Sequence, residues 1–116
     1  MRENRIIDTH VHYSLPCFNS IREELITTLA DYGVDAFIEV AIGFSTNQRI
    51  LQFCEKYSMA YAAIGVHPKY IRALDCEKFY QLERLLDKEQ KIVAIGETGL
   101  DFSCCHESEP KDLQKK

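Results

Sequence analysis

Four short apolar stretches alternate along the chain with segments in which apolar residues recur every three or four positions. The apolar stretches cover residues 5–9, 35–42, 59–66 and 91–96. Each stretch is nearly continuous in apolar residues rather than alternating, which is typical of strands buried on both faces of a parallel sheet. We therefore predict four parallel β-strands separated by helical segments.

The segments between these stretches have the periodicity of amphipathic helices. In the first segment, Ile21, Leu25 and Leu29 recur every four residues. The second helix is predicted to begin with Ser45 as its N-cap, and the third is predicted to begin near Asp75. The residues expected to face the core are Ile50, Leu51, Cys54 and Tyr57 in the second helix, and Phe79, Leu82 and Leu86 in the third.

The repeating order of strand and helix, at about 30 residues per unit, is typical of a (β/α)₈ barrel or of a doubly wound sheet. Residues 108–116 resemble the beginning of a fourth helix, with Ser108 as N-cap and Pro110 in the first turn. Only about two turns are available there, fewer than an isolated helix needs. We expect an α/β fold that corresponds to the N-terminal half of a TIM-type (β/α)₈ barrel, with about four parallel βα units. Residues 1–116 would then be one partial, truncated domain.

Composition narrows the class of protein. The chain of 116 residues is 46% hydrophobic and 28% charged, as in ordinary globular domains. Its formal net charge of −4 argues against broad electrostatic binding of nucleic acid. It does not exclude a nuclease, because bound divalent cations reverse the sign of the charge locally. Five cysteines without a C-x-x-C pair, no signal-peptide core and no transmembrane stretch lead us to expect a cytoplasmic protein away from membranes.

Two histidines, His10 and His12, lie one residue apart at the end of the first apolar stretch. Residues two apart on a strand project to the same side, so these imidazoles can reach one point in space. That geometry suits a divalent metal ion. The alternative is two strand-end histidines that bond to backbone or water. Asp8 shares their face and would either orient one imidazole or remain a solvated carboxylate.

Glu97 ends the fourth apolar stretch, where a carboxylate would be costly to bury. A metal ion would explain its position, and so would a salt bridge to lysine or arginine. A carboxylate can also bridge two cations, which the histidine pair alone could not hold. Gly96 and Gly99 flank this residue, and we expect them to permit a close backbone approach or a sharp turn.

His67 ends the third apolar stretch and is held extended by the proline that follows it. In a functional role it would grip a substrate oxygen, with Lys69 or Arg72 nearby to meet a phosphate. From the residues alone, an ordinary turn residue is the favoured interpretation. The tripeptide Cys104-Cys105-His106 offers metal ligands, but adjacent cysteines do not easily chelate one ion, so we interpret it as a loop.

Three motifs together resemble the signatures of the TatD family of metal-dependent hydrolases and deoxyribonucleases, a branch of the amidohydrolase-like (β/α)₈ barrels. The last motif is the most specific, and the resemblance runs along essentially the whole chain, which corresponds to the first part of a family member. In order, the motifs are Ile7-Asp8-Thr9-His10-Val11-His12, Ile64-Gly65-Val66-His67-Pro68 and Ile95-Gly96-Glu97-Thr98-Gly99-Leu100-Asp101-Phe102.

The resemblance implies a role for each of four residues. His10 and His12 would bind a first divalent cation, and Glu97, as metal ligand and catalytic residue, would bridge it to a second. His67 would contact the substrate. With two cations per site, as Mg²⁺, Mn²⁺ or Zn²⁺, the implied reaction is hydrolysis of phosphodiester bonds in DNA, of the 3′–5′ exonuclease type.

Two alternatives remain beside this hypothesis. The family has two further metal-binding histidines and an aspartate on later strands, and the sequence ends before them, so the chain could be an inactive remnant with weak metal binding. An amidohydrolase acting on C–N bonds commonly has a modified lysine where this chain has Glu97, which favours the nuclease hypothesis. Four parallel strands would also leave two open sheet edges, through which self-association is expected.

Overall fold

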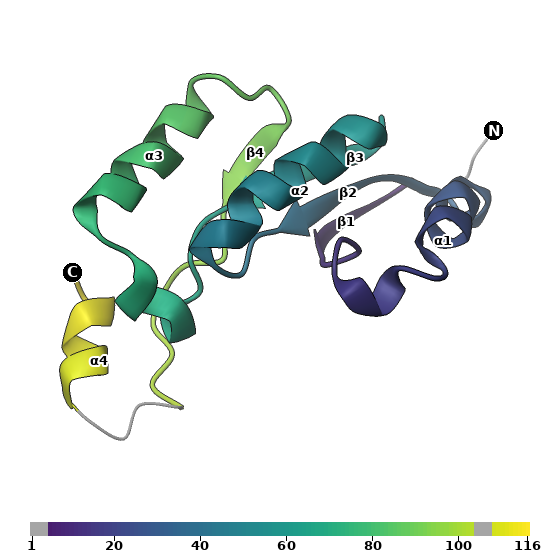
Figure 1. Cartoon of the computed structure of the whole chain (residues 1–116). Helices are drawn as coiled ribbons and strands as arrows, with labels where there is room; N and C mark the ends of the chain where they lie inside the picture. The colour runs from purple at the N-terminus through teal and green to yellow at the C-terminus, as the bar shows by residue number, and fades with distance from the viewer. Residues whose placement is uncertain (1–4, 104–107) are drawn as a thin grey trace.

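The computed structural model describes residues 5–103 and 108–116. Its four parallel strands form one sheet in the order β1-β2-β3-β4, the same as their order in the chain (Figure 1). The strands are β1 (Ile6–Val11), β2 (Val34–Val40), β3 (Ala60–Ile64) and β4 (Ile92–Ile95). The helices are α1 (Arg22–Leu29), α2 (Phe44–Lys56), α3 (Cys76–Leu86) and α4 (Ser108–Gln114), with short 3-10 helices η1 (Pro16–Phe18), η2 (Ala30–Tyr32) and η3 (Pro68–Ala73).

This strand order decides between the two α/β architectures that the sequence left open. Right-handed crossovers between successive neighbouring strands place every connecting helix on the same face of the sheet. A doubly wound sheet instead reverses its strand order and carries helices on both faces. The prediction of about four parallel βα units of the barrel type is therefore confirmed, and the α/β fold class with it.

The core lies between the sheet and α2. The side chains of Phe37, Ile50 and Ile64 are at most 2% exposed, and Cys54 is fully buried beside them. The predicted inner face of α2 is thus confirmed, except that Tyr57 lies just after the helix and is partly buried. Among the described residues, no helix is long and apolar enough to cross a lipid bilayer.

The start of α2 differs from the prediction. Its N-cap is Gly43, and Ser45 lies inside the helix. The reason is the Thr46 hydroxyl, which accepts the N–H groups of Ile42 and Gly43 at 2.9 and 3.0 Å. Because Thr46 satisfies these N–H groups, the helix begins earlier than a serine cap would place it.

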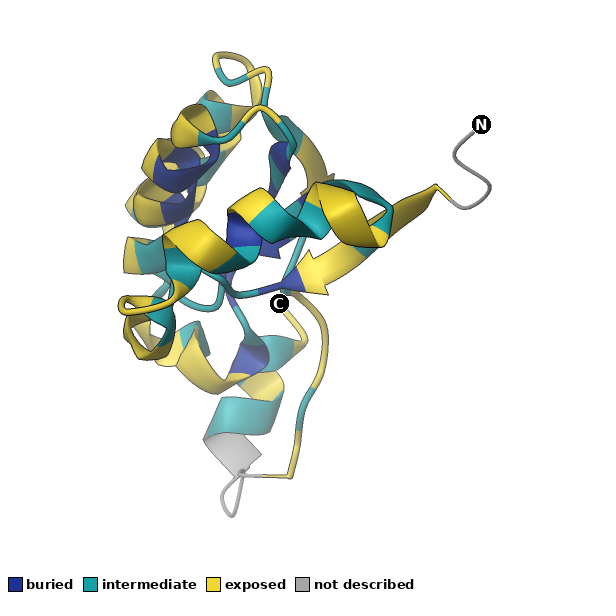
Figure 2. Cartoon of the chain, turned by 90° about the vertical axis from the view of Figure 1, so that its right-hand side faces the viewer, coloured by how far each residue is buried: buried dark blue, intermediate teal, exposed yellow. Residues whose placement is uncertain are grey.

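The strands are unequally buried. β3 is buried almost throughout and β2 is buried mainly in its second half, whereas Ile7 in β1 and Val93 and Ile95 in β4 are more than half exposed. Figure 2 shows β1, next to the N-terminus, exposed along most of its length. The expectation of strands buried on both faces therefore holds for β3 and for the second half of β2. In the described part of the chain each outer strand has one neighbour, and self-association through these edges stays a prediction.

The predicted buried face of α3 is wrong in this structure. Asp75 is the N-cap as predicted, and its Oδ1 accepts the Lys78 N–H at 2.8 Å. However, Phe79 and Leu86 are exposed and only Leu82 is partly buried. These side chains line an open apolar groove of about 480 Å³, because the described elements cover only part of this helix face.

Cys54 provides a test of the packing between α2 and β3. Its Sγ donates to the Tyr61 carbonyl at 3.3 Å, and burial, aided by the charge of Glu39, raises the pKa of the thiol to about 12. At pH 8 only about 10⁻⁴ of this thiol is ionised, so we expect it to resist iodoacetamide in the native chain. The exposed Cys17 and Cys76 should be alkylated. Mass spectrometry of the peptides checks this, and modification of Cys54 as fast as Cys17 would contradict it.

Candidate metal centre

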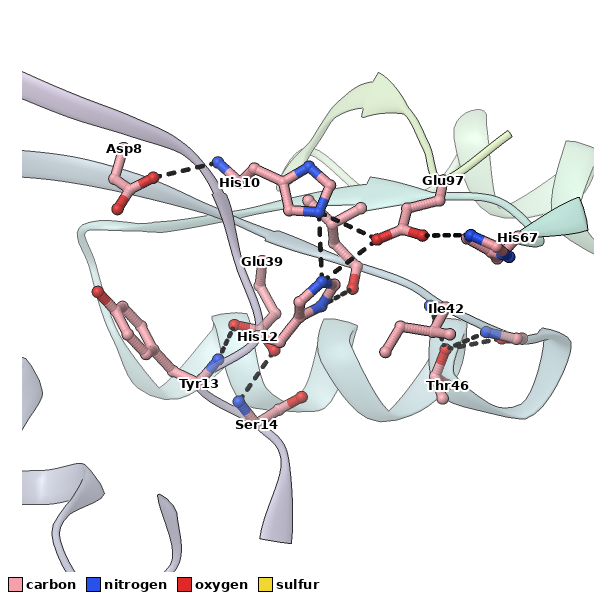
Figure 3. Close-up of polar contacts among 12 residues, drawn as sticks. Asp8, His10, His12, Tyr13, Ser14, Glu39, Ile42, Thr46, His67 and Glu97 are labelled. Atoms are coloured by element: carbon pink, nitrogen blue, oxygen red, sulfur yellow. Dashed lines mark hydrogen bonds and ion pairs between the residues drawn. The ribbon is translucent and has the colours of Figure 1, made fainter. Parts of the chain in front are cut away.

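Three side chains converge beyond the carboxyl ends of β1 and β4 (Figure 3). The ligand atoms of His10, His12 and Glu97 all lie within 4.8 Å of one another. Glu97 Oε1 is 3.0 Å from His10 Nε2 and 3.2 Å from His12 Nε2. The two Nε2 atoms are 3.2 Å apart. The histidine spacing on β1 thus brings both imidazoles to one point, and the fourth strand brings a carboxylate to the same point.

The orientation of His12 is set by the end of β2. Its Nδ1 lies 2.9 Å from the Val40 carbonyl oxygen, to which the Nδ1–H donates. An imidazole that carries its proton on Nδ1 keeps the Nε2 lone pair available for a cation. This lone pair is directed toward Glu97, as a metal ligand requires.

Asp8 acts on the strand backbone rather than on an imidazole. Its Oδ1 accepts the backbone N–H of His10 at 3.2 Å. Of the two alternatives for Asp8, orientation of an imidazole and a solvated carboxylate, neither describes this bond to the backbone. Asp8 instead holds the backbone from which His10 projects.

His67 lies on the other side of Glu97. Its Nε2 is 3.6 Å from Glu97 Oε2, the carboxylate oxygen that does not contact the histidine pair. Its Nδ1 accepts the Lys69 N–H at 3.0 Å and so caps η3. Because Nδ1 is an acceptor in this bond, Nε2 carries the proton and can donate to an oxygen. His67 therefore caps the turn, as an ordinary turn residue would, and also lies beside Glu97.

His10, His67 and Glu97 line an open cleft of about 420 Å³. Asp101 also lines it, although the sequence analysis assigned this residue no role. Hydrogen bonds from the Ser103 hydroxyl and N–H hold the pKa of the Asp101 carboxyl below its ordinary value, and the charge of Lys69 lowers it further. Asp101 thus stays ionised at neutral pH. The tripeptide Cys104-Cys105-His106 lies outside the described residues.

Gly65 allows Glu97 to reach the histidines. The chain after β4 crosses the end of β3, and the Glu97 N–H donates to the Ala41 carbonyl at 2.9 Å. A Cβ on Gly65 would lie 2.5 Å from the Glu97 carbonyl oxygen, closer than real contacts allow. A Cβ on Gly96 would meet Ala63 at an ordinary 3.7 Å, so the close approach expected at Gly96 belongs to Gly65. Gly99 has a φ of 126°, which fits its predicted turn.

Two buried polar side chains support this arrangement, and the sequence analysis missed both. Glu39, fully buried on β2, accepts the N–H groups of Tyr13 and Ser14 at 2.8 and 2.9 Å. It thereby fixes the chain directly after His12. A carboxylate inside an apolar stretch is the signal that could have revealed it.

Asn47 on α2 is the second, and it is 1% exposed. It accepts the Gly65 N–H and donates to the Gly65 carbonyl, both at 2.8 Å. This pair of bonds ties α2 to the residue over which Glu97 passes. The signal that could have revealed Asn47 is a polar residue on the otherwise apolar face of the predicted helix.

Replacement of Asn47 by alanine should lower the free energy of unfolding by about 2–6 kcal/mol. Both backbone groups of Gly65 would lose a buried partner, and each such loss costs about 1–3 kcal/mol. Urea denaturation measures the change. The exposed neighbour Gln48, replaced by alanine as a control, should shift stability by less than about 0.5 kcal/mol. Equal stabilities of the two variants would contradict the structural role of Asn47.

Comparison with known proteins gives a family match. Residues 7–116 match the family model described as TatD related DNase. The metal-dependent hydrolase YjjV of Escherichia coli, named as uncharacterized, is 36% identical over 99 residues, which are 84% of this chain and 38% of that protein. The 3′-5′ ssDNA/RNA exonuclease TatD of Cronobacter turicensis is 33% identical over 86 residues, covering 74% of this chain and 32% of that protein.

A solved structure agrees with the sequence comparison. The crystal structure of YJJV, a TATD homolog from Escherichia coli K12, superposes with a TM-score of 0.79 at 33% identity. The match covers 96% of this chain and 42% of that one. The chain thus spans about two fifths of the length of the relatives that it matches.

Proposed function

This chain belongs to the family of TatD-related DNases, and on that premise we propose that it hydrolyses phosphodiester bonds in nucleic acid with the help of divalent cations. The observation that carries the proposal is the meeting of His10, His12 and Glu97 within 4.8 Å beside an open cleft. Relatives of this chain are named metal-dependent hydrolases, and that description fits such a cluster.

The donor set fits a divalent cation. Two imidazole nitrogens and a carboxylate oxygen suit Zn²⁺ or Mn²⁺, whereas Mg²⁺ prefers oxygen ligands. We propose that His10 and His12 hold a cation through Nε2 and that Glu97 holds it through Oε1. A cation bound there supplies a Lewis acid that activates water and neutralises charge building up on the phosphate oxygens.

The two carboxylate oxygens of Glu97 face different neighbours. Oε1 faces the histidine pair, and Oε2 faces His67. We propose that Glu97 would bridge the first cation to a second one on the His67 side of the carboxylate. The His67 Nε2–H would then donate to an oxygen of the substrate and orient the phosphate for attack.

We propose single-stranded DNA as the substrate and removal of nucleotides from its 3′ end as the reaction. The relative from Cronobacter turicensis is named a 3′-5′ ssDNA/RNA exonuclease, which supports this polarity. The open cleft is also compatible with a strand end that enters from outside.

The test is a hydrolysis assay with the chain and an oligonucleotide labelled at its 5′ end. We expect a ladder of products that shorten stepwise from the 3′ end with Mn²⁺, Mg²⁺ or Zn²⁺, and no products with EDTA. Products cut at internal positions would refute the exonuclease polarity. No products with any of the three metals, from folded protein, would refute the hydrolase itself.

A further inference from the structure

The segment that follows His67 carries basic and aromatic side chains. We call it the rim of the cleft because it continues directly from His67 and Pro68, which line the cleft. Lys69, Tyr70 and Arg72 are all exposed on η3. Side chains three apart on a 3-10 helix lie above one another, so Lys69 and Arg72 share a face. η3 itself begins at the carboxyl end of β3, and His67 caps it. The cap that orients His67 therefore also fixes the position of these three side chains.

Tyr70 is held beside His67 with part of its ring surface open. Its ring centroid is 6.5 Å from that of His67, at an interplanar angle of 70°. It also lies over the loop after β2, because a Cβ on Gly43 would be 3.9 Å from the Tyr70 ring. With 43% of its surface exposed, Tyr70 can present an aromatic surface to a ligand that reaches His67.

The positive charge of Lys69 acts on the same rim. Its Nζ is 5.9 Å from the Tyr70 ring centroid. The Lys69 charge also helps to keep the pKa of the Asp101 carboxyl low, and Asp101 lines the cleft. Lys69 thus places a positive charge near the cleft of a chain whose formal net charge is −4. An aromatic surface beside a cation is the combination that binds single-stranded nucleic acid through a base and a phosphate.

We propose that Tyr70 and Lys69 form a nucleotide-binding subsite on the rim of the cleft, in which Tyr70 stacks on a base and Lys69 pairs with a backbone phosphate. The subsite rests on the proposed function, because it binds the strand whose end enters the cleft. His67 is a neighbour of both Tyr70 and Glu97, so a base stacked on Tyr70 would place the adjoining phosphate near the metal centre.

The test measures binding of a fluorescent oligothymidylate by anisotropy in EDTA, where hydrolysis does not contribute. We expect Tyr70→Leu and Lys69→Gln each to raise the Kd about fivefold or more, while Tyr70→Phe, which keeps the ring, binds as the unmodified chain does. Lys69→Gln should also reduce the slope of log Kd against log salt by about one. The matched controls are Tyr80→Leu on α3 and Lys56→Gln at the end of α2, both exposed and both expected to leave the Kd unchanged.

The outcomes separate this subsite from the proposed reaction. Weaker binding by the two rim variants, with folding intact by circular dichroism, supports the subsite even if the chain hydrolyses nothing. Equal Kd values for the rim variants and their controls overturn the subsite, even if the chain is an active nuclease. Absence of binding by the unmodified chain overturns it as well.

Discussion

Replacing Glu97 by glutamine is expected to weaken divalent-cation binding at least about 100-fold, because loss of a ligand should cost more than the 10–100-fold caused by loss of an outer partner. Glutamine has the same shape but is neutral, and only one of its two terminal atoms can accept a cation. Both carboxylate oxygens are in use here, one toward the histidine pair and one toward His67. Titration calorimetry with Mn²⁺ measures the affinity.

Hydrolysis should fall with the affinity in this variant, by about 10³-fold or more, since cation-based charge stabilisation contributes several kcal/mol to the barrier. Glu55→Gln is the matched control, because it removes the same charge from an exposed position on α2. We expect the control to bind and react as the unmodified chain does. If Glu97→Gln bound Mn²⁺ as tightly as Glu55→Gln, Glu97 would not be a ligand.

Replacing Gly65 by alanine is expected to weaken cation binding at the same site by displacing the backbone of Glu97. The new Cβ would lie 2.5 Å from the Glu97 carbonyl oxygen and 2.8 Å from the Gly96 carbonyl carbon, so the backbone that carries Glu97 must move. We expect about tenfold or more weaker cation binding and a loss of about 1–3 kcal/mol in the free energy of unfolding. Mn²⁺ titration and urea denaturation measure the two effects.

The control for this change is Gly43→Ala, another glycine in a loop after a strand. A Cβ there would meet only the Tyr70 ring, at an ordinary 3.9 Å, and Gly43 has the extended backbone that alanine adopts easily. It should therefore preserve cation affinity. If Gly65→Ala retained the affinity of Gly43→Ala, the close approach at Gly65 would not position Glu97.

The parts of the site that could be predicted are those that follow a regular period or a simple energetic cost. His10 and His12 share a side because side chains alternate along a strand. Glu97 was recognisable because a carboxylate at the end of an apolar stretch needs a compensating partner. The parallel sheet then places the ends of β1 and β4 at the same edge.

The parts that could not be predicted depend on contacts between distant segments. The need for glycine at position 65 arises only because the chain after β4 crosses the end of β3. Asn47 bonds to that glycine from a different helix. For α3, the periodicity identified an apolar face correctly but could not show how much of it the described elements cover.

The ligands of the candidate metal centre are far apart in sequence, since Glu97 follows His10 by 87 positions. They come from the two outermost strands, and everything between them must be in place before they meet. No single segment of the chain carries all three ligands, so a partly unfolded chain could not keep the complete site. Cation affinity is therefore a measure of the integrity of all four strands, and loss of the cation and loss of the fold should occur as one cooperative event.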